Sequence, residues 1–171
     1  GGGIDVAQVG MAIATARRLG AVVHGFDVRE AAREQVESLG ARFVFPEVEV
    51  SAEGNGGYAA AQSDAQQEQL RRALAAQIAQ MQLVISSAQI PGKRAPILID
   101  KQTVHGMAPG SVIVDLAAES GGNSSLTRAD EIVEENGVRI YGPTNLPSLM
   151  ATDASRLFSA NVRALLEHLV D

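Results

Sequence analysis

Short apolar runs alternate with amphipathic segments along most of this chain. The run at residues 111–117 is nearly continuous in apolar residues, which is typical of a parallel strand buried on both faces. Between such runs the apolar residues recur at helical intervals, as Ala32, Val36 and Leu39 do ahead of the stop signal Gly40. Strands that alternate with helices predict an α/β fold built on a parallel, doubly wound sheet.

The pattern also sets the expected bounds of the elements. Strands are predicted at residues 21–27, 41–45, 82–87, 111–117 and 137–142, and helices at residues 29–40, 64–81, 101–110 and 148–171. The last helix is amphipathic, with Leu157, Val162, Leu165, Leu166 and Leu169 roughly on one stripe. Residues 46–63 are polar and glycine-rich and predict a loop. We therefore expect a Rossmann-like domain at residues 1–146 that lacks its first strand, followed by a C-terminal helix at residues 147–171.

The composition is that of a globular domain, and it argues against several classes of function. The 171 residues are 46% hydrophobic and 20% charged, as in an ordinary globular domain. A net charge of −6 and an aromatic content of 4% argue against a nucleic-acid surface. The chain has no cysteine, its 3 histidines show no ligand spacing, and no apolar run is long enough to span a membrane. We expect no metal site, no nucleic-acid partner and no direct membrane span.

The first residues resemble a dinucleotide-binding turn. In G-x-G-x-x-G the glycines let bare backbone approach a pyrophosphate, which the N-terminus of the next helix stabilises. Gly1 and Gly3 fit the first two places, but Val6 holds the third and the next glycine is Gly10. This stretch by itself is equally compatible with a glycine-rich terminus.

Asp27 ends a predicted strand at the usual distance from such a turn. An acid there accepts hydrogen bonds from the adenosine ribose hydroxyls. A 2′-phosphate would instead face a carboxylate, at a cost of about 4 kcal/mol per charge pair at an effective dielectric near 20. Asp27 therefore favours NAD(H) over NADP(H). Arg29 could accommodate that phosphate, but we interpret it as a solvated charge in the first turn of the next helix.

Two further stretches carry candidate chemistry. The loop at residues 53–61 combines glycines, Gly57 among them, with Tyr58, which could lie against a flat ring; a plain surface loop is the alternative. Asp115 and Glu119 lie at the carboxyl end of a predicted strand and suggest acid–base chemistry, but no histidine or lysine adjoins them in the sequence.

Five segments together resemble a known family: residues 12–43, "GNGGYA", "IPGKRAPILI", "PGSVIVDLAAESGGN" and "TNLPSLMATDASRLFSAN". In this order they are similar to the NAD(H)-binding component of proton-translocating nicotinamide nucleotide transhydrogenase. Alanine dehydrogenases share the fold and some of these motifs. The resemblance implies hydride transfer from NADH to NADP⁺ held on another domain, coupled to proton movement by a separate membrane domain.

The resemblance also assigns residue roles. Asp27 is expected to bind the adenosine ribose with Val28 and Arg29 beside it, and Tyr58 to close over the nucleotide with Gly57. The segment lining the nucleotide corresponds to Ser87, Ala88 and Gln89, where the family usually reads Thr-Ala-Leu. Other expected cofactor contacts are Gly1, Gly3, Glu119 and Asn145. Glu119 stands where alanine dehydrogenases carry a catalytic aspartate, and it is the one possible catalytic residue.

The chain departs from the family in two respects. About three residues, nearly one helical turn, are added between the glycine turn and its helix. We also expect that this sequence lacks the first strand of the fold and the preceding domain that contacts the nicotinamide. The terminal helix is expected to pack on that domain.

The resemblance further implies a homodimer at the cytoplasmic or mitochondrial-matrix face of a membrane, with the NADP(H)-binding domain and the membrane domain as partners. The alternatives are an alanine dehydrogenase-like amino-acid oxidoreductase and a nucleotide-binding module without catalysis.

Overall fold

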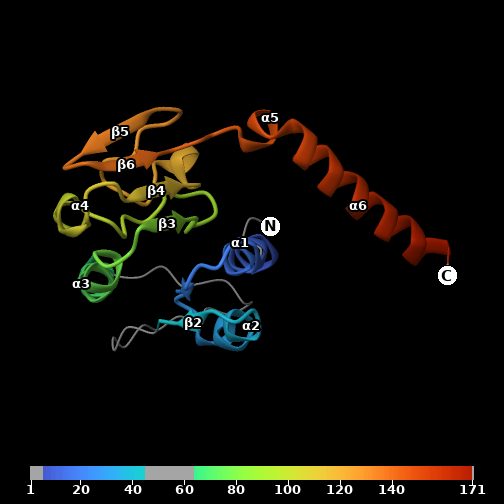
Figure 1. Cartoon of the computed structure of the whole chain (residues 1–171), viewed down its shortest axis with the longest axis horizontal. Coiled ribbons are helices and arrows are strands. Elements are labelled where there is room, and N and C mark those ends of the chain that lie inside the picture. The colour runs from blue at the N-terminus through green and yellow to red at the C-terminus, as the bar shows by residue number, and fades with distance from the viewer. Residues whose placement is uncertain (1–5, 45–63, 171) are drawn as a thin grey trace.

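Strands and helices alternate through the computed structural model, which describes residues 6–44 and 64–170 (Figure 1). The strands form two sheets, a two-stranded one of order β1-β2 and a four-stranded one of order β3-β4-β6-β5. Except for the β5–β6 pair, the strands within each sheet are parallel. This confirms the predicted α/β class.

The N-terminal half holds the smaller sheet. Helix α1 (Val6–Arg18) precedes β1 (His24–Gly25), and the 3₁₀ turn η1 (Glu30–Ala32) and helix α2 (Arg33–Ser38) lead to β2 (Arg42–Phe43). A small core forms where Ile13 of α1 meets Val36 of α2 and Ala41. Gly25 is required in β1, because a Cβ there would lie 2.6 Å from the Val36 side chain.

The C-terminal half holds the larger sheet and a separate core. Helix α3 (Asp64–Ile78) leads to β3 (Leu83–Ser86), and helix α4 (Lys101–Gly106) leads to β4 (Val112–Asp115). The turn η2 (Ala118–Ser120) and strand β5 (Ile132–Glu135) then precede β6 (Val138–Tyr141). The core contains Ile99, Val104, Met107, Ile113, Val138 and Ile140.

The strand order shows where a first strand of the doubly wound fold would belong. In a sheet of order 3-2-1-4-5-6, the observed strands correspond to β2-β1 on one side and β3-β4-β6 on the other, with the first strand between them. Within the described residues no ladder joins β1 to β3. The apolar Leu83 and Ile85, which lie on one face of β3, are 54% and 49% exposed.

Strand β5 is absent from the prediction. It pairs antiparallel with β6 through a turn at Asn136 and Gly137, which both adopt positive φ, of 52° and 75°. Asn-Gly is the preferred pair for a two-residue hairpin whose central residues both need positive φ. The Asn136-Gly137 pair, at the start of the strand predicted at residues 137–142, is therefore the feature of the sequence that indicates this hairpin.

The C-terminal segment is helical but interrupted. Helix α5 (Leu146–Leu149) ends at Met150, whose φ of −124° and ψ of 46° are not helical, and α6 (Ala151–Val170) follows. Helix α6 extends away from both sheets (Figure 1), and its large apolar residues are exposed, Phe158 at 71% and Leu169 at 70%. In the described part of the chain, no helix has both the length and the apolar character to span a membrane.

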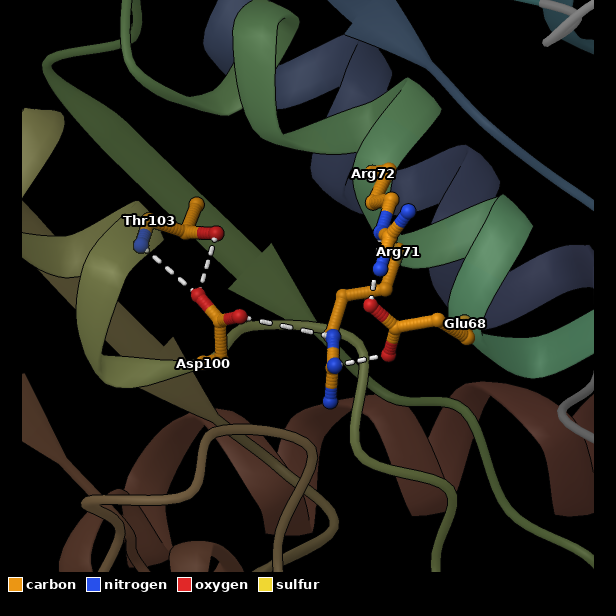
Figure 2. Close-up of polar contacts among 5 residues, drawn as sticks. All are labelled: Glu68, Arg71, Arg72, Asp100 and Thr103. Atoms are coloured by element: carbon orange, nitrogen blue, oxygen red, sulfur yellow. Dashed lines mark hydrogen bonds and ion pairs between the residues drawn. The ribbon is translucent and has the colours of Figure 1, made fainter. Parts of the chain in front are cut away.

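An ionic network joins α3 to the start of α4 (Figure 2). Asp100 caps α4 by accepting from the Thr103 backbone N–H at 2.7 Å and from its hydroxyl at 2.8 Å. Arg71 of α3 lies 3.4 Å from the other Asp100 oxygen and also pairs with Glu68, which binds Arg72. Burial opposes ionisation of Asp100, but the Thr103 hydrogen bonds and the Arg71 charge outweigh it and lower the pKa of Asp100.

Asp100→Asn should separate the charge of this residue from its capping role, because asparagine caps helices as well as aspartate. The lowered pKa of Asp100 means that its charge stabilises the fold above the unfolded-state pKa, near 4, and that this contribution is lost as pH falls through the folded pKa. The variant should lose less than about 1 kcal/mol at pH 7 and show a flatter decline in acid. Urea unfolding from pH 7 to pH 2 measures both, and parallel curves for variant and parent would contradict the assignment.

Candidate functional site

The loops that follow β3 and β4 lie together at the carboxyl edge of the larger sheet, where ligands bind in open α/β folds. The Leu116 N–H donates to the Ser86 carbonyl at 2.8 Å and continues the pairing with β3 one residue past the end of β4. The Gln89 side chain donates to the Leu116 carbonyl at 3.4 Å. The predicted segment at residues 87–89 therefore sits against the loop that carries Glu119.

Asp115, the last residue of β4, organises that loop. Its side chain is fully buried and accepts four hydrogen bonds, from Ala117 N at 3.1 Å, Asn123 N at 2.7 Å, Ser124 N at 3.0 Å and Thr127 Oγ1 at 2.6 Å. The chain folds around the carboxylate through Gly122, which has a φ of 78° and whose Cβ would lie 2.9 Å from Asp115 Oδ2. The Asp115 carboxylate thus has a structural role as a hydrogen-bond acceptor for the loop. It is not a candidate general acid or base.

Asn123 connects the two loops. Its side chain is fully buried, accepts from Ala88 N at 2.9 Å, and donates to the Ala88 and Pro96 carbonyls at 2.9 Å each. All three bonds bridge segments far apart in the sequence. The backbone of the predicted cofactor segment is therefore fixed by Asn123, which is in turn fixed by Asp115.

The sequence interpretation missed Asn123. Its signal was the Gly-Gly-Asn sequence after a buried strand: Gly121 and Gly122 both adopt positive φ, of 101° and 78°, and the sharp turn brings the next side chain back beneath the loop. A glycine pair after a buried strand therefore indicates that the polar residue following it can turn back and bind a neighbouring loop.

Asp27 and Arg29 form a tight pair just after β1. Arg29 donates its backbone N–H and Nε to Asp27 Oδ1, at 2.8 and 3.0 Å, and Nη2 to Oδ2 at 2.9 Å. The side chains are 27% and 34% exposed, respectively. The hydrogen bond to Asp27 raises the pKa of Arg29 further. The interpretation of Arg29 as a solvated charge needs correction, because its guanidinium is hydrogen-bonded to Asp27.

The remaining predicted residues are placed as follows. Glu119 lies exposed in η2, and Val28 and Ser87 are half-buried. Asn145 is exposed and caps α5, accepting from Ser148 N at 3.3 Å. Gly1, Gly3, Gly57 and Tyr58 lie outside the described residues. The structure thus brings Ala88 and Gln89 to the loop of Glu119, whereas Asp27 with Arg29 and Asn145 occupy separate places.

In the described ranges, no group of three or more histidine, aspartate or glutamate side chains converges in a way that could hold a metal ion. His105 instead contacts Glu135 at 2.6 Å, and Lys101 lies 3.1 Å from the same oxygen. The His105 and Lys101 contacts lower the pKa of Glu135 and link α4 to β5.

The strand order and the loops at the carboxyl edge place the molecule in the Rossmann-like, doubly wound class. Within that class, the family model "Alanine dehydrogenase/PNT, C-terminal domain" matches residues 1–171, and the chain belongs to this family. The predicted resemblance is therefore confirmed.

Similar proteins include both a transhydrogenase subunit and an alanine dehydrogenase. The first of the parts that make up NAD(P) transhydrogenase subunit alpha in Rhodospirillum rubrum is 46% identical over 171 residues, 99% of this chain and 44% of that protein. Alanine dehydrogenase 1 of Staphylococcus aureus (strain N315) is 35% identical over 99 residues, covering 55% of this chain and 27% of that protein. The chain thus spans less than half the length of these relatives.

Solved structures agree with the sequence relatives. The crystal structure of transhydrogenase from Sinorhizobium meliloti superimposes with a TM-score of 0.70 at 41% identity, covering 94% of this chain and 41% of that one. An L-alanine dehydrogenase gives a TM-score of 0.59 at 25% identity, covering 88% and 38%. The transhydrogenase is the more similar of the two in fold and in sequence.

Asp115→Asn should destabilise the fold by about 1–3 kcal/mol, because the amide turns a buried acceptor into a donor that faces a backbone N–H. Chemical denaturation at pH 7 measures the change. Asp153→Asn is the matched control, since the Asp153 side chain is 53% exposed. Equal stability of the two variants would contradict the organising role of Asp115.

Proposed function

We propose that this chain is the NAD(H)-binding domain of a transhydrogenase, which transfers hydride between NADH and NADP⁺. The observation that carries the proposal is the 46% identity to a transhydrogenase alpha subunit along 99% of the chain. The alanine dehydrogenase similarity covers only 55% of it. The location of Asp27 after β1 and of Ala88 after β3 supports a dinucleotide lying across the carboxyl edge.

The described residues fit the adenosine end of such a cofactor. The Asp27 side chain is 27% exposed, so a ribose hydroxyl can reach it. Ser87, Ala88 and Gln89 would line the nucleotide, on a backbone that Asn123 holds in place. We assign pyrophosphate binding to the start of α1 with Gly1 and Gly3, closure over the nucleotide to Gly57 and Tyr58, and further contacts to Val28, Glu119 and Asn145.

The nicotinamide ring of the bound cofactor supplies the hydride. The residues of this chain bind and orient the dinucleotide. A rigid edge lowers the entropic cost of positioning a reactant, and the hydrogen bonds of Asp115 and Asn123 provide that rigidity here. Hydride transfer between two nicotinamides needs no general base, which agrees with the structural use of Asp115.

The partners follow from the same proposal. The domain would act with an NADP(H)-binding domain and with a membrane domain that couples the reaction to proton translocation. We place it as a homodimer, peripheral to the membrane at the cytoplasmic or mitochondrial-matrix face. The relatives named as subunits support an assembly of several components.

Two other functions make different predictions. An alanine dehydrogenase-like enzyme, supported by the structural similarity with a TM-score of 0.59, would oxidise NADH with pyruvate and ammonia. A nucleotide-binding module without catalysis would bind NADH and support neither reaction.

Calorimetric titration of the intact protein with NADH and NADPH, followed by two assays, separates these functions. We expect preference for NADH, and hydride transfer to an NADP⁺ analogue once the NADP(H)-binding and membrane domains are present. Asp27→Asn should weaken NADH binding about tenfold, because the ribose then loses its charge-assisted hydrogen bond to a carboxylate. NADH oxidation that requires pyruvate and ammonia would instead establish the dehydrogenase, and binding without either reaction would establish the module.

We also propose that residues 147–171 form a separate unit, whose helix α6 packs on another region of the protein outside the Rossmann-like domain at residues 1–146. Four residues of the predicted stripe, Val162, Leu165, Leu166 and Leu169, share one face of α6 with Phe158, whereas Leu157 falls outside that face. These five side chains support the proposal, because each is at least 39% exposed in the described chain. A contiguous apolar helix face of this kind marks an interaction surface.

Leu165→Ser should therefore destabilise the intact protein by about 2–4 kcal/mol, as for a buried leucine. Ala160→Ser, on the opposite side of the helix, should change stability by less than about 0.5 kcal/mol. Thermal unfolding of both variants tests the proposal, and equally small effects would show that the stripe stays in water.

A further inference from the structure

The pair of Asp27 and Arg29 leaves few groups free for a ligand. A carboxylate offers about four lone-pair positions, and Arg29 donors fill three of those on Asp27. Among the described residues, the position that remains lies on Oδ2, which accepts from Nη2 of Arg29. One ribose hydroxyl can donate there without breaking the pair.

Arg29 retains donors as well. A guanidinium has about five N–H groups, and Asp27 engages two of them in a bidentate contact. The positive charge of the guanidinium is therefore paired with the carboxylate of Asp27. Because the raised pKa of Arg29 keeps it charged, the pair is close to neutral as a unit at physiological pH.

We propose that Asp27 sets cofactor selectivity by holding Arg29, and that Arg29 is a latent site for the 2′-phosphate of NADP(H). This rests on the proposed function, because it assumes that the adenosine ribose binds beside Asp27. A 2′-phosphate can take the bidentate Nε–Nη2 edge of Arg29 only after the guanidinium leaves Asp27. That rearrangement breaks two charge-assisted hydrogen bonds and leaves a bare carboxylate beside the phosphate.

A simpler explanation is that Asp27 repels the phosphate directly and Arg29 has no role in selectivity. The two explanations differ in how the effects of the two residues combine. Under direct repulsion, removing the Asp27 charge improves NADPH binding whether or not Arg29 is present. Under our proposal, the improvement requires the released Arg29. A double-mutant cycle measures this difference as a coupling between the residues.

The variants are Asp27→Asn, Arg29→Gln and the double variant, each in the intact protein, with NADH and NADPH affinities measured by calorimetry. Asp27→Asn should bind NADPH about tenfold more tightly than the parent, because the released Arg29 then donates one charge-assisted hydrogen bond to the phosphate. The double variant should lose that improvement. Arg29→Gln should bind NADPH more weakly than the parent, because Asp27 is then uncompensated, and should still bind NADH.

Glu30→Gln is the matched control, since it removes the same charge from a neighbouring residue that pairs with Arg33 at 3.4 Å. It should leave both affinities unchanged. NADPH affinity that rises equally in Asp27→Asn and the double variant would overturn the role of Arg29 while leaving the proposed function intact. A parent protein that binds neither dinucleotide would overturn the proposed function and this inference together.

Discussion

The buried carboxylate of Asp115 is the point on which the carboxyl edge of the larger sheet depends. It accepts hydrogen bonds from three backbone N–H groups and one hydroxyl. These bonds offset the cost of removing a charge from water, and they fix the path of the chain from β4 to Ser124. The same path delivers Asn123 beneath the neighbouring loop. One charge at the end of one strand thus determines the shape of two loops.

The sequence predicted the elements well where periodicity was strong. The strands at residues 82–87, 111–117 and 137–142 and the helix at residues 64–81 all have counterparts, although the observed elements are shorter. Hairpin strand β5 was missed because its alternation is brief and its signal lies in the Asn136-Gly137 turn. A hydrophobic pattern can be recognised only when burial repeats over several helical turns or strand residues. A short edge strand such as β5 is therefore too brief to show one.

The candidate site was harder to predict, and for a different reason. Asp27 could be placed from its position at the end of a strand, but the pairing of Arg29 with Asp27 depends on the backbone and side-chain conformations of both residues, which no residue type dictates. Asn123 was invisible because its partners, Ala88 and Pro96, are 35 and 27 residues away in the sequence. Contacts of this kind exist only once the sheet has brought its strands together. Residue roles at Gly1, Gly3, Gly57 and Tyr58 stay predictions from family resemblance.

The two separate cores give the domain a particular response to a bound nucleotide. Each half-sheet packs on its own apolar cluster, so amide hydrogens in the two halves can exchange through independent local openings. Asp27 belongs to one half and the loop held by Asn123 to the other. A ligand that contacts both joins the two units into one cooperative unit. Its binding energy then appears as slowed amide exchange in both halves, including at positions far from the ligand.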